Sequence, residues 1–484
     1  MLSADRVHEE EGQDSGARVL SSVDYYRDRA VRARMLEGCG AEAGGRPSAA
    51  YVAGLGEGGP PLQTWIEAVG TPADQIPTLW ARGLDISRSL WDETHLVFMF
   101  ELDYLNVDQP AEPFLRPAEV FFKLEPTYRA AKQEFRLLDL TPRTIMTGRG
   151  YQFAGAVPLD HPVVDRLAAL AGTPSWFAGV DRRRPPGVRT PMSARQAAAA
   201  EGLGRLIEYT AQRVLARAVR TSEIPVVFNG TVVGSGRVGR ECVSIDSSHV
   251  GDPLDVRLMR LPFSTYQWHR LRPDIFGLQT ASLPALAALP QGQQLLFTRL
   301  TVGRGLRAGI KAARNADGRL PNVATGIDTL LTRYSGSRLA AFHREFDADR
   351  SGASPTAFVE DPATLPPCAT AALTWPNDRL LKPEHIQHLV RVLMARGASA
   401  AAIAALVQSA YETDHQWGDR WLRMDPRTRA DFDVRVFAGM IATGLDSLVD
   451  FNCVSAQEKD VCPRAGCQFD LRVDRDRLAR AASA

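Results

Sequence analysis

The chain has 484 residues, more than one ordinary hydrophobic core accommodates, so we expect two or three domains. Its composition, 45% hydrophobic and 23% charged, is that of a globular protein, and with a net charge of +1 any nucleic-acid surface must be a local patch. The acidic first residues predict no signal peptide, and no run reaches the roughly 20 apolar residues that span a bilayer. We therefore expect a cytoplasmic protein with no membrane partner, in which clustered cysteines indicate metal binding or burial rather than disulfides.

Strand and helix patterns begin after a first region without motifs. Residues 1–90 mix short amphipathic stretches with Gly- and Pro-rich loops, and their role is not apparent from the sequence. The apolar run HLVFMFELDYL at 95–105 predicts a buried strand, and apolar residues at helical spacing over 120–138 predict a helix packed on it. Gly148-Arg149-Gly150 separates two further apolar runs, which predicts a strand–turn–strand unit.

The middle and the end of the chain differ in pattern. A long helix over 193–219 precedes three strand-like runs, IPVVF, ECVSID and VRLMRL, so we expect an α+β or α/β domain over 91–300. The Gly-, Arg- and Asp-rich residues 301–362 predict a linker or irregular connection. Residues 363–484 are helical in pattern, with one helix ending at Gly397 and the next N-capped by Ser399.

Two carboxylates at the end of the predicted 95–105 strand are the first candidates for chemistry. Glu101 and Asp103 are two residues apart, so on a strand both side chains leave the same face. Carboxylates held this close repel unless cations lie between them, an arrangement that collects Mg²⁺ or Mn²⁺ for phosphoryl transfer. A solvated strand end is the alternative interpretation of the pair.

The order of motifs resembles the archaeo-eukaryotic primase superfamily. In that family an acidic pair ends a hydrophobic strand, a small-x-His motif follows, and a further acidic residue lies on a later strand. FMFELDYLN, MTGRGYQF and ECVSID stand in this order, and the resemblance covers about residues 95–270. It implies a primase-type, RRM-like catalytic domain that joins nucleoside triphosphates on a single-stranded DNA or RNA template.

The resemblance also implies roles for single residues. Glu101, Asp103 and Asp246 would be the catalytic ligands of Mg²⁺ or Mn²⁺. The guanidinium group of arginine has a planar, forked shape that matches two phosphate oxygens. Two arginines, Arg257 and Arg260, follow the third motif. The alternative is that both are simply exposed residues at the end of a strand. The implied nucleotide-binding residues are Gly148, Arg149, Gly150, Gln152, Arg257, Arg260 and Ser264.

Two positions depart from the family pattern. The acidic pair begins with Glu101 where the family has Asp, which shifts a bound metal by about a bond length. The position of the motif histidine, a contact of the nucleotide phosphates in the family, holds Gln152. Glutamine donates a hydrogen bond but carries no positive charge, so reduced or absent catalysis is an alternative expectation.

Four of the six cysteines fall in the last quarter of the chain. Cys453, Cys462 and Cys467 have the spacing C-x8-C-x4-C, and Cys368 lies far upstream in LPPCATAAL. Such a set can close a tetrahedral metal site or ligate a four-iron cluster. From about 365 to 470 the chain is similar to the C-terminal domain of the primase large subunit, which implies an all-helical domain with a [4Fe–4S] cluster; zinc is the alternative.

Three other signals are set aside. GSGRVG at 234–239 fits a dinucleotide-binding pattern but precedes a strand rather than a helix. The basic run DRRRPPGVR, with Arg182, Arg183, Arg184 and Arg189, is either a nucleic-acid contact or a solvated loop. His385 and His388 are three apart on a predicted helix, and a surface or core placement is favoured over metal binding.

The sequence therefore predicts a nucleotidyltransferase of the primase-polymerase type. Its parts would be residues 1–90 of unclear role, a catalytic domain over 91–300, a connection over 301–362 and a cysteine-cluster domain over 363–484. The alternative is a catalytically impaired nucleic-acid-binding or scaffold protein that keeps the primase fold. A third possibility is another nucleotidyltransferase on the same fold, associated with ligation or repair.

Overall fold

The structure is a computed structural model of the chain. It describes residues 19–42, 45–56, 70–180, 187–188, 192–230, 240–251, 258–291, 304–352, 364–374, 379–380, 382–413, 425–463 and 467–483. The motif at 234–239, Arg257 and the arginines of the basic run 182–189 lie outside these residues. Among the described residues, no helix is both long and apolar enough to cross a membrane.

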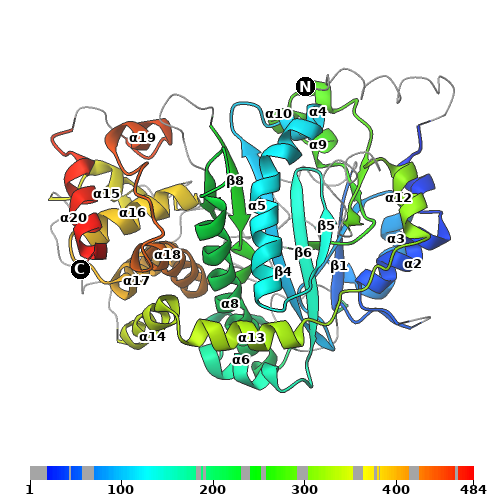
Figure 1. The fold of residues 1–484 in the computed structure, drawn as a ribbon, viewed down its shortest axis with the longest axis horizontal. Coiled ribbons are helices and arrows are strands. Elements are labelled where there is room, and N and C mark those ends of the chain that lie inside the picture. The colour runs from blue at the N-terminus through cyan, green and yellow to red at the C-terminus, as the bar shows by residue number, and fades with distance from the viewer. Residues whose placement is uncertain are drawn as a thin grey trace.

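A mixed six-stranded sheet forms the centre of the molecule (Figure 1). Its longest strand, β4 (His95–Asn106), lies between β6 (Gly150–Pro158) and β8 (Glu241–Asp246) and is antiparallel to both. The predicted 95–105 strand and the turn at Gly148-Arg149-Gly150 are confirmed. The sheet is completed by β5 (Arg143–Met146) and β12 (Leu289–Gln291) at one edge and β7 (Val226–Phe228) at the other, the last parallel to β8.

Two long helices cover one face of this sheet. Along β4, Phe98, Phe100 and Leu102 alternate with the residues of the opposite face, and all three are buried against helices. The helices are α5 (Pro117–Leu137), which lies over β4 and β6, and α8 (Ala194–Ala218), N-capped by Ser193. The apolar spacing over 120–138 thus correctly predicts the buried side of α5.

The opposite face of the sheet meets a second, smaller sheet built largely from the N-terminal region. Its strand order is β2-β1-β3-β9, in which the first three strands come from residues 51–88 and the last from the chain after β8. These strands are β2 (Thr71–Pro72), β1 (Tyr51–Leu55), β3 (Asp85–Arg88) and β9 (Met259–Arg260). Helices α1 (Ser22–Tyr25), α2 (Arg29–Gly38), α3 (Ile76–Ala81) and α12 (Leu306–Ala313) share a hydrophobic cluster with it.

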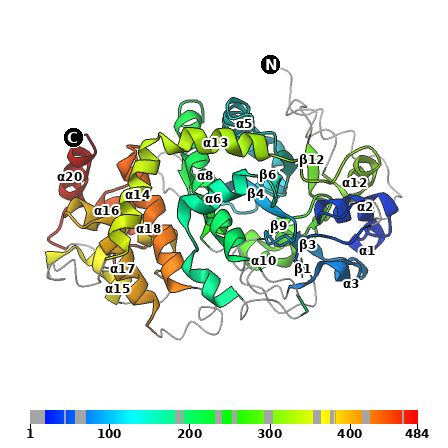
Figure 2. The ribbon, with the colours of Figure 1, turned by 90° about the horizontal axis from the view of Figure 1, so that it is seen from below.

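The segment 301–362 was predicted as a linker or irregular connection, and that prediction is wrong. Its described residues hold α12 and two more helices, α13 (Ala324–Ser335) and α14 (Arg338–Arg350). Figure 2 shows α13 lying beside α6 (Val163–Ala171) and leading to α14. Ile327 and Leu330 are fully buried, so α13 packs as part of the core instead of spanning between domains.

The remainder of the described chain is helical. Helix α16 (Pro383–Ala395) is followed by Gly397 at φ +89°, a conformation that glycine adopts without strain, and Ser399 caps the next helix through the amide of Ala402. The other helices are α15 (Pro367–Thr374), α17 (Ala400–Tyr411), α18 (Pro426–Ala442), α19 (Cys453–Glu458) and α20 (Leu471–Ser483). The protein is therefore α+β with a helical C-terminal region, as predicted.

Candidate active site and cysteine cavity

Strand register brings the three predicted carboxylates onto one face of the central sheet. Glu101 on β4 lies directly opposite Asp246 on β8 and, on its other side, opposite Gln152 on β6. Residues opposite each other in antiparallel strands share a face, with Cβ atoms about 5 Å apart. Asp103 is the next residue of β4 on that face and lies opposite Gly150. Five predicted site residues thus form two adjacent rows across neighbouring strands: Gln152, Glu101 and Asp246 in one, Gly150 and Asp103 in the other.

This carboxylate face is the one that α5 and α8 leave uncovered. Val97 and Met99 precede Glu101 on the same side of β4 and pack against Met259 and Ala288 of the smaller sheet and its neighbouring loop. The face therefore changes from apolar to acidic along one strand. Tyr151 and Phe153, which alternate with Gln152 along β6, belong to the opposite, helix-covered core.

Each carboxylate already has a hydrogen-bond partner. Arg149 donates two hydrogen bonds to Asp103 Oδ2, at 3.0 Å from Nε and 2.6 Å from an η nitrogen. Gln152 Nε2 donates to Glu101 Oε1 at 3.1 Å, and the Ser248 amide donates to Asp246 Oδ1 at 2.9 Å. Glu101, Asp103 and Gln152 are buried, whereas Asp246 is partly exposed at the end of β8.

Gln152 also carries an unsatisfied atom. Its side chain is only 4% exposed, and its Oε1 has no hydrogen-bond partner among the described residues. The other amide orientation would place that oxygen against the Glu101 carboxylate, so the orientation with Nε2 toward Glu101 is the favourable one. A buried carbonyl oxygen without a donor costs about 1–3 kcal/mol, which a ligand hydroxyl or amine would recover.

The turn that carries Arg149 is held closely by its surroundings. A side chain at Gly150 would meet the Leu102 carbonyl oxygen at 1.9 Å, and one at Gly148 would meet the Tyr266 ring at 2.4 Å. Both positions therefore need glycine for the turn to approach β4 and Tyr266. The turn places Arg149 at the edge of the carboxylate face with 26% of its side chain exposed.

Arg304 is a second cation at this turn, and sequence analysis missed it. Its guanidinium donates to the Gly148 carbonyl at 2.9 Å, and it lies over the Phe121 ring at 5.0 Å. Burial lowers the pKa of Arg304 to about 10, so the side chain stays charged at neutral pH. The signal was a second Gly-Arg-Gly segment at 303–305, inside the predicted linker.

Arg260 and Ser264 are buried, and their side chains connect β3 to the chain around β9. Ser264 is fully buried, accepts from the Ile86 amide at 2.6 Å and donates to the Thr265 carbonyl at 3.1 Å. Arg260 is 5% exposed, donates to the same carbonyl at 2.8 Å and lies 3.4 Å from Asp85. These contacts give both residues a structural role between β3 and β9, where the sequence predicted phosphate contacts.

The four C-terminal cysteines surround one cavity of about 120 Å³. Cys368 lies in α15, Cys453 begins α19, and Cys462 and Cys467 lie between α19 and α20. Burial and, secondarily, the three neighbouring thiols raise the pKa of the Cys368 thiol to about 12. The remaining walls come from Pro366, Ala456, Gln457, Phe469 and Leu471.

No group of three or more His, Cys, Asp or Glu among the described residues is already arranged to hold a single metal ion. At the carboxylates, Arg149 compensates part of the charge, and Gln152 donates a hydrogen bond to Glu101. At the cysteines, a cavity separates the thiols. Four thiolates bound to one zinc ion at about 2.3 Å would leave no such space between them, so the cavity suits a larger inorganic group better.

Fold and site together define an α+β protein with a triad of carboxylates on one sheet face and a four-cysteine cavity in its helical region. No protein-family model and no curated protein sequence matches the chain. Among solved structures, the polymerase domain of ligase D from Mycobacterium tuberculosis, in complex with DNA, matches with 13% sequence identity and a TM-score of 0.29. The match covers 65% of this chain and 89% of that one.

Proposed function

We propose that the chain is a primase-polymerase type nucleotidyltransferase that joins nucleoside triphosphates on a single-stranded template. The observation that carries this proposal is the placement of Glu101, Asp103 and Asp246 in adjacent register positions on the sheet face opposite α5 and α8. Oxygen-only ligand sets of this kind suit Mg²⁺ or Mn²⁺. Bound there, two such ions would lower the pKa of an attacking 3′-hydroxyl and neutralise the incoming triphosphate.

Arg149 would change partners when substrate arrives. Its guanidinium occupies Asp103 Oδ2, and a triphosphate is a stronger partner because it offers several charged oxygens to the same fork. Transfer of Arg149 from Asp103 to the triphosphate would release the carboxylate for a metal ion. Metal and nucleotide should therefore bind with positive cooperativity, each favouring the state that the other needs.

Gln152 and Arg304 would support the same substrate. The Gln152 Oε1 atom can accept a hydrogen bond from a substrate hydroxyl while Nε2 keeps Glu101 in place. Arg304 holds the Gly148 carbonyl and adds positive charge beside the turn. Both act through geometry and charge, and neither needs to donate or accept a proton.

The cysteine cavity would hold a [4Fe–4S] cluster ligated by Cys368, Cys453, Cys462 and Cys467. The fit is one of chemistry and space, since four thiols face a cavity larger than a single zinc ion needs. A bound cluster would fix α15, α19 and the chain before α20 relative to one another. Template or nucleotide would then be held by a helical region of fixed shape.

The proposal is tested by incubating the full chain with labelled nucleotides, Mn²⁺ or Mg²⁺ and single-stranded DNA or RNA. We expect oligonucleotide synthesis that is lost in Asp246→Asn. Binding of single-stranded nucleic acid with no synthesis under either metal would favour the alternative, an inactive binding or scaffold protein. Specific observations favour that alternative too, because Gln152 replaces the family histidine and Arg149 already neutralises Asp103.

A further inference from the structure

A second cavity lies where the α+β part meets the C-terminal helices. It has a volume of about 380 Å³ and is bounded by α8, α14, α18 and the turn η4 (Ser175–Gly179). Its volume falls in the range of small-molecule sites, roughly 300–1,000 Å³. We call it the junction cavity.

Arginine dominates the polar wall of the junction cavity. Arg205, Arg350 and Arg435 are 5%, 8% and 3% exposed, and Arg427 adds a fourth guanidinium at the rim. Three carboxylates also line the cavity, Glu201, Asp347 and Asp431, so the lining carries one net positive charge. Arg435 is also paired with Glu208 behind the lining, so an anion would be attracted mainly by the guanidinium groups that can exchange partners, those of Arg205 and Arg427.

The ion pairs in the cavity wall do not use every hydrogen-bond donor of these arginines. Arg205 donates its two η nitrogens to Asp347, at 2.5 and 3.0 Å, but its buried Nε has no hydrogen-bond partner among the described residues. Asp347 is 41% exposed, so it can turn toward solvent and give its place to another anion. Arg427 is 48% exposed and lies 3.6 Å from Asp431, a loose pair that is also easily exchanged.

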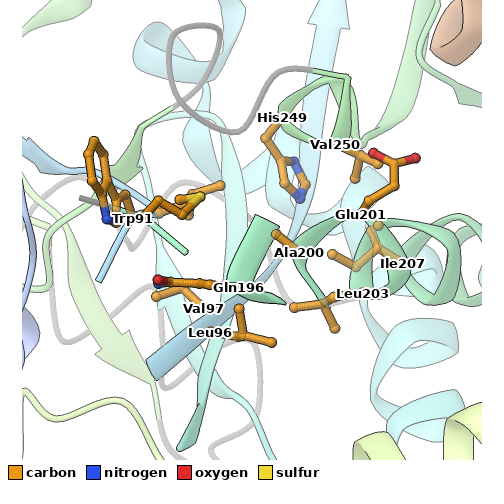
Figure 3. Close-up of a pocket in the computed structure, with 13 residues that line it drawn as sticks. Trp91, Leu96, Val97, Gln196, Ala200, Glu201, Leu203, Ile207, His249 and Val250 are labelled. Carbon is orange, nitrogen blue, oxygen red and sulfur yellow. The ribbon is translucent and has the colours of Figure 1, made fainter. Parts of the chain in front are cut away.

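The rest of the lining fits an organic ligand rather than a bare ion. Phe346, Phe432 and Val250 supply an apolar wall, and Ser175 and Thr428 supply hydroxyls at the other side. A smaller cavity of about 40 Å³ adjoins it and shares Glu201 and Val250 (Figure 3). Its wall is mostly apolar and its volume suits water rather than an organic ligand, so of these two adjoining cavities the junction cavity is the one with room for a ligand.

We propose that the junction cavity binds a small organic phosphate of the nucleotide class, with its phosphates on Arg205, Arg350 and Arg427 and its apolar part against Phe346 and Phe432. Guanidinium forks and phosphate oxygens match in geometry and charge. The ligand would tie α8 to α14 and α18, and so join the α+β part to the helical region. The site does not require the polymerase reaction and needs no metal ion.

The test is calorimetric titration of the full chain with ADP and with inorganic pyrophosphate, in EDTA so that no divalent ion supports binding at the carboxylates. We expect ADP to bind, and Arg427→Ala to weaken binding at least about tenfold, since a hydrogen bond to a charged group contributes about 1.5–3 kcal/mol. Asp347→Asn removes the anion that competes for Arg205 and should tighten binding by a similar factor. Both residues are at the rim, so folding is retained and circular dichroism verifies it.

The matched control is Arg344→Ala. Arg344 is an exposed arginine on α14, the helix that carries Asp347, and it does not line the cavity, so its replacement should leave binding unchanged. Pyrophosphate binding that responds to the same variants would show that the phosphates provide most of the affinity. No binding of either probe at about 1 mM would overturn the proposal. So would ADP binding that is lost in Arg149→Ala and unaffected by Arg427→Ala, because the nucleotide would then occupy the carboxylate site.

Discussion

The carboxylate face and the cysteine cavity are assembled in opposite ways. Backbone hydrogen bonds between β4, β6 and β8 fix the carboxylates, and Arg149 already offsets part of their charge. The cysteines come from segments distant in the chain, and only helix packing brings them round their cavity. A site set by strand register can exist without its ligand, whereas the positions of the cysteines depend on how α15, α19 and α20 pack around the cavity.

This difference predicts which site depends on its inorganic partner for stability. Removing divalent ions should leave the fold around Glu101 and Asp103 unchanged, since Arg149 pairs with Asp103 and Gln152 donates a hydrogen bond to Glu101. Emptying the cysteine cavity should loosen the helical region, since the binding energy of a group held by several thiolates contributes to folding. The following experiments test that contrast, beginning with the largest expected effect.

Cys368→Ser should have the largest effect on stability. Cys368 is buried in the shared hydrophobic core and faces the cavity, so the change removes one ligand and leaves a polar group there. We expect anaerobically purified wild type to be brown and the variant to lose its visible absorption and melt several degrees lower. Cys242→Ser is the control, because Cys242 is buried in β8 away from the cavity and should keep the colour. Colourless wild type with one equivalent of zinc would make the site a zinc centre.

Asp246→Asn should have the largest effect on activity. Asp246 is partly exposed at the end of a strand, so the side-chain amide of the asparagine fits without strain. The variant lacks the negative charge that binds a divalent cation. We expect primer synthesis to fall at least about 100-fold with the melting temperature unchanged, since metal ligands contribute several kcal/mol to the transition state. Asp108→Asn, in the exposed chain after β4, is the matched control. Full synthesis by the Asp246 variant would contradict the carboxylate assignment.

The helical region should also be sensitive to pH. Burial, with Arg391 and Lys459 nearby, lowers the pKa of His388 to about 3, and burial lowers that of His385 to about 4. The unfolded state, with a histidine pKa of about 6.5, binds protons first, so stability is complete above pH 6.5 and is lost as pH falls from 6.5 toward 4. At pH 5 the loss is about 2 kcal/mol per histidine.

Denaturant unfolding at pH 7.5 and pH 5 measures this loss. His388→Gln, which cannot take up a proton, should remove only the part of this difference that His388 contributes, since burial also lowers the pKa values of His385, His269 and His343. His161→Gln is the control, because that ring is partly exposed and lies beside the N-terminus of α6 in the α+β part. An identical pH dependence in wild type and His388→Gln would show that another group is responsible.

Much of the fold could be predicted because several of its elements are specified by a single short segment of the sequence. The apolar run at 95–105, the helical spacing over 120–138 and the caps around Ser399 each specify a local structure. The acidic face followed from the two-residue spacing of Glu101 and Asp103. The grouping of Asp246 with these two residues came from a family resemblance. In the structure, the strand register puts Asp246 opposite Glu101, on the same sheet face.

Other parts depend on contacts that no short segment encodes. Strands of two to five residues, such as β1, β2 and β3, are too short to show a period, so the second sheet was missed, although its last strand, β9, lies within the predicted run VRLMRL. The Gly-, Arg- and Asp-rich composition of residues 301–362 wrongly indicated an irregular connection. Ile327, Leu330 and Leu331 in this segment do have helical spacing. Residues such as Ser264 fit a family motif, yet burial and strand pairing decide what their side chains contact.

Gln152→His is the subtlest test of the carboxylate face. One ring nitrogen can take over the hydrogen bond to Glu101, and a proton on the ring would add the positive charge that the family histidine supplies. The nearby carboxylates favour that protonated form. We expect the KM for the nucleoside triphosphate to fall a few-fold, and more at pH 6 than at pH 8, because protonation increases as pH falls. Gln152→Leu, which keeps the volume and loses the hydrogen bond, should raise the KM. If the KM of the histidine variant equals that of the wild type at both pH values, the side chain at 152 holds Glu101 in position and does not contact phosphate.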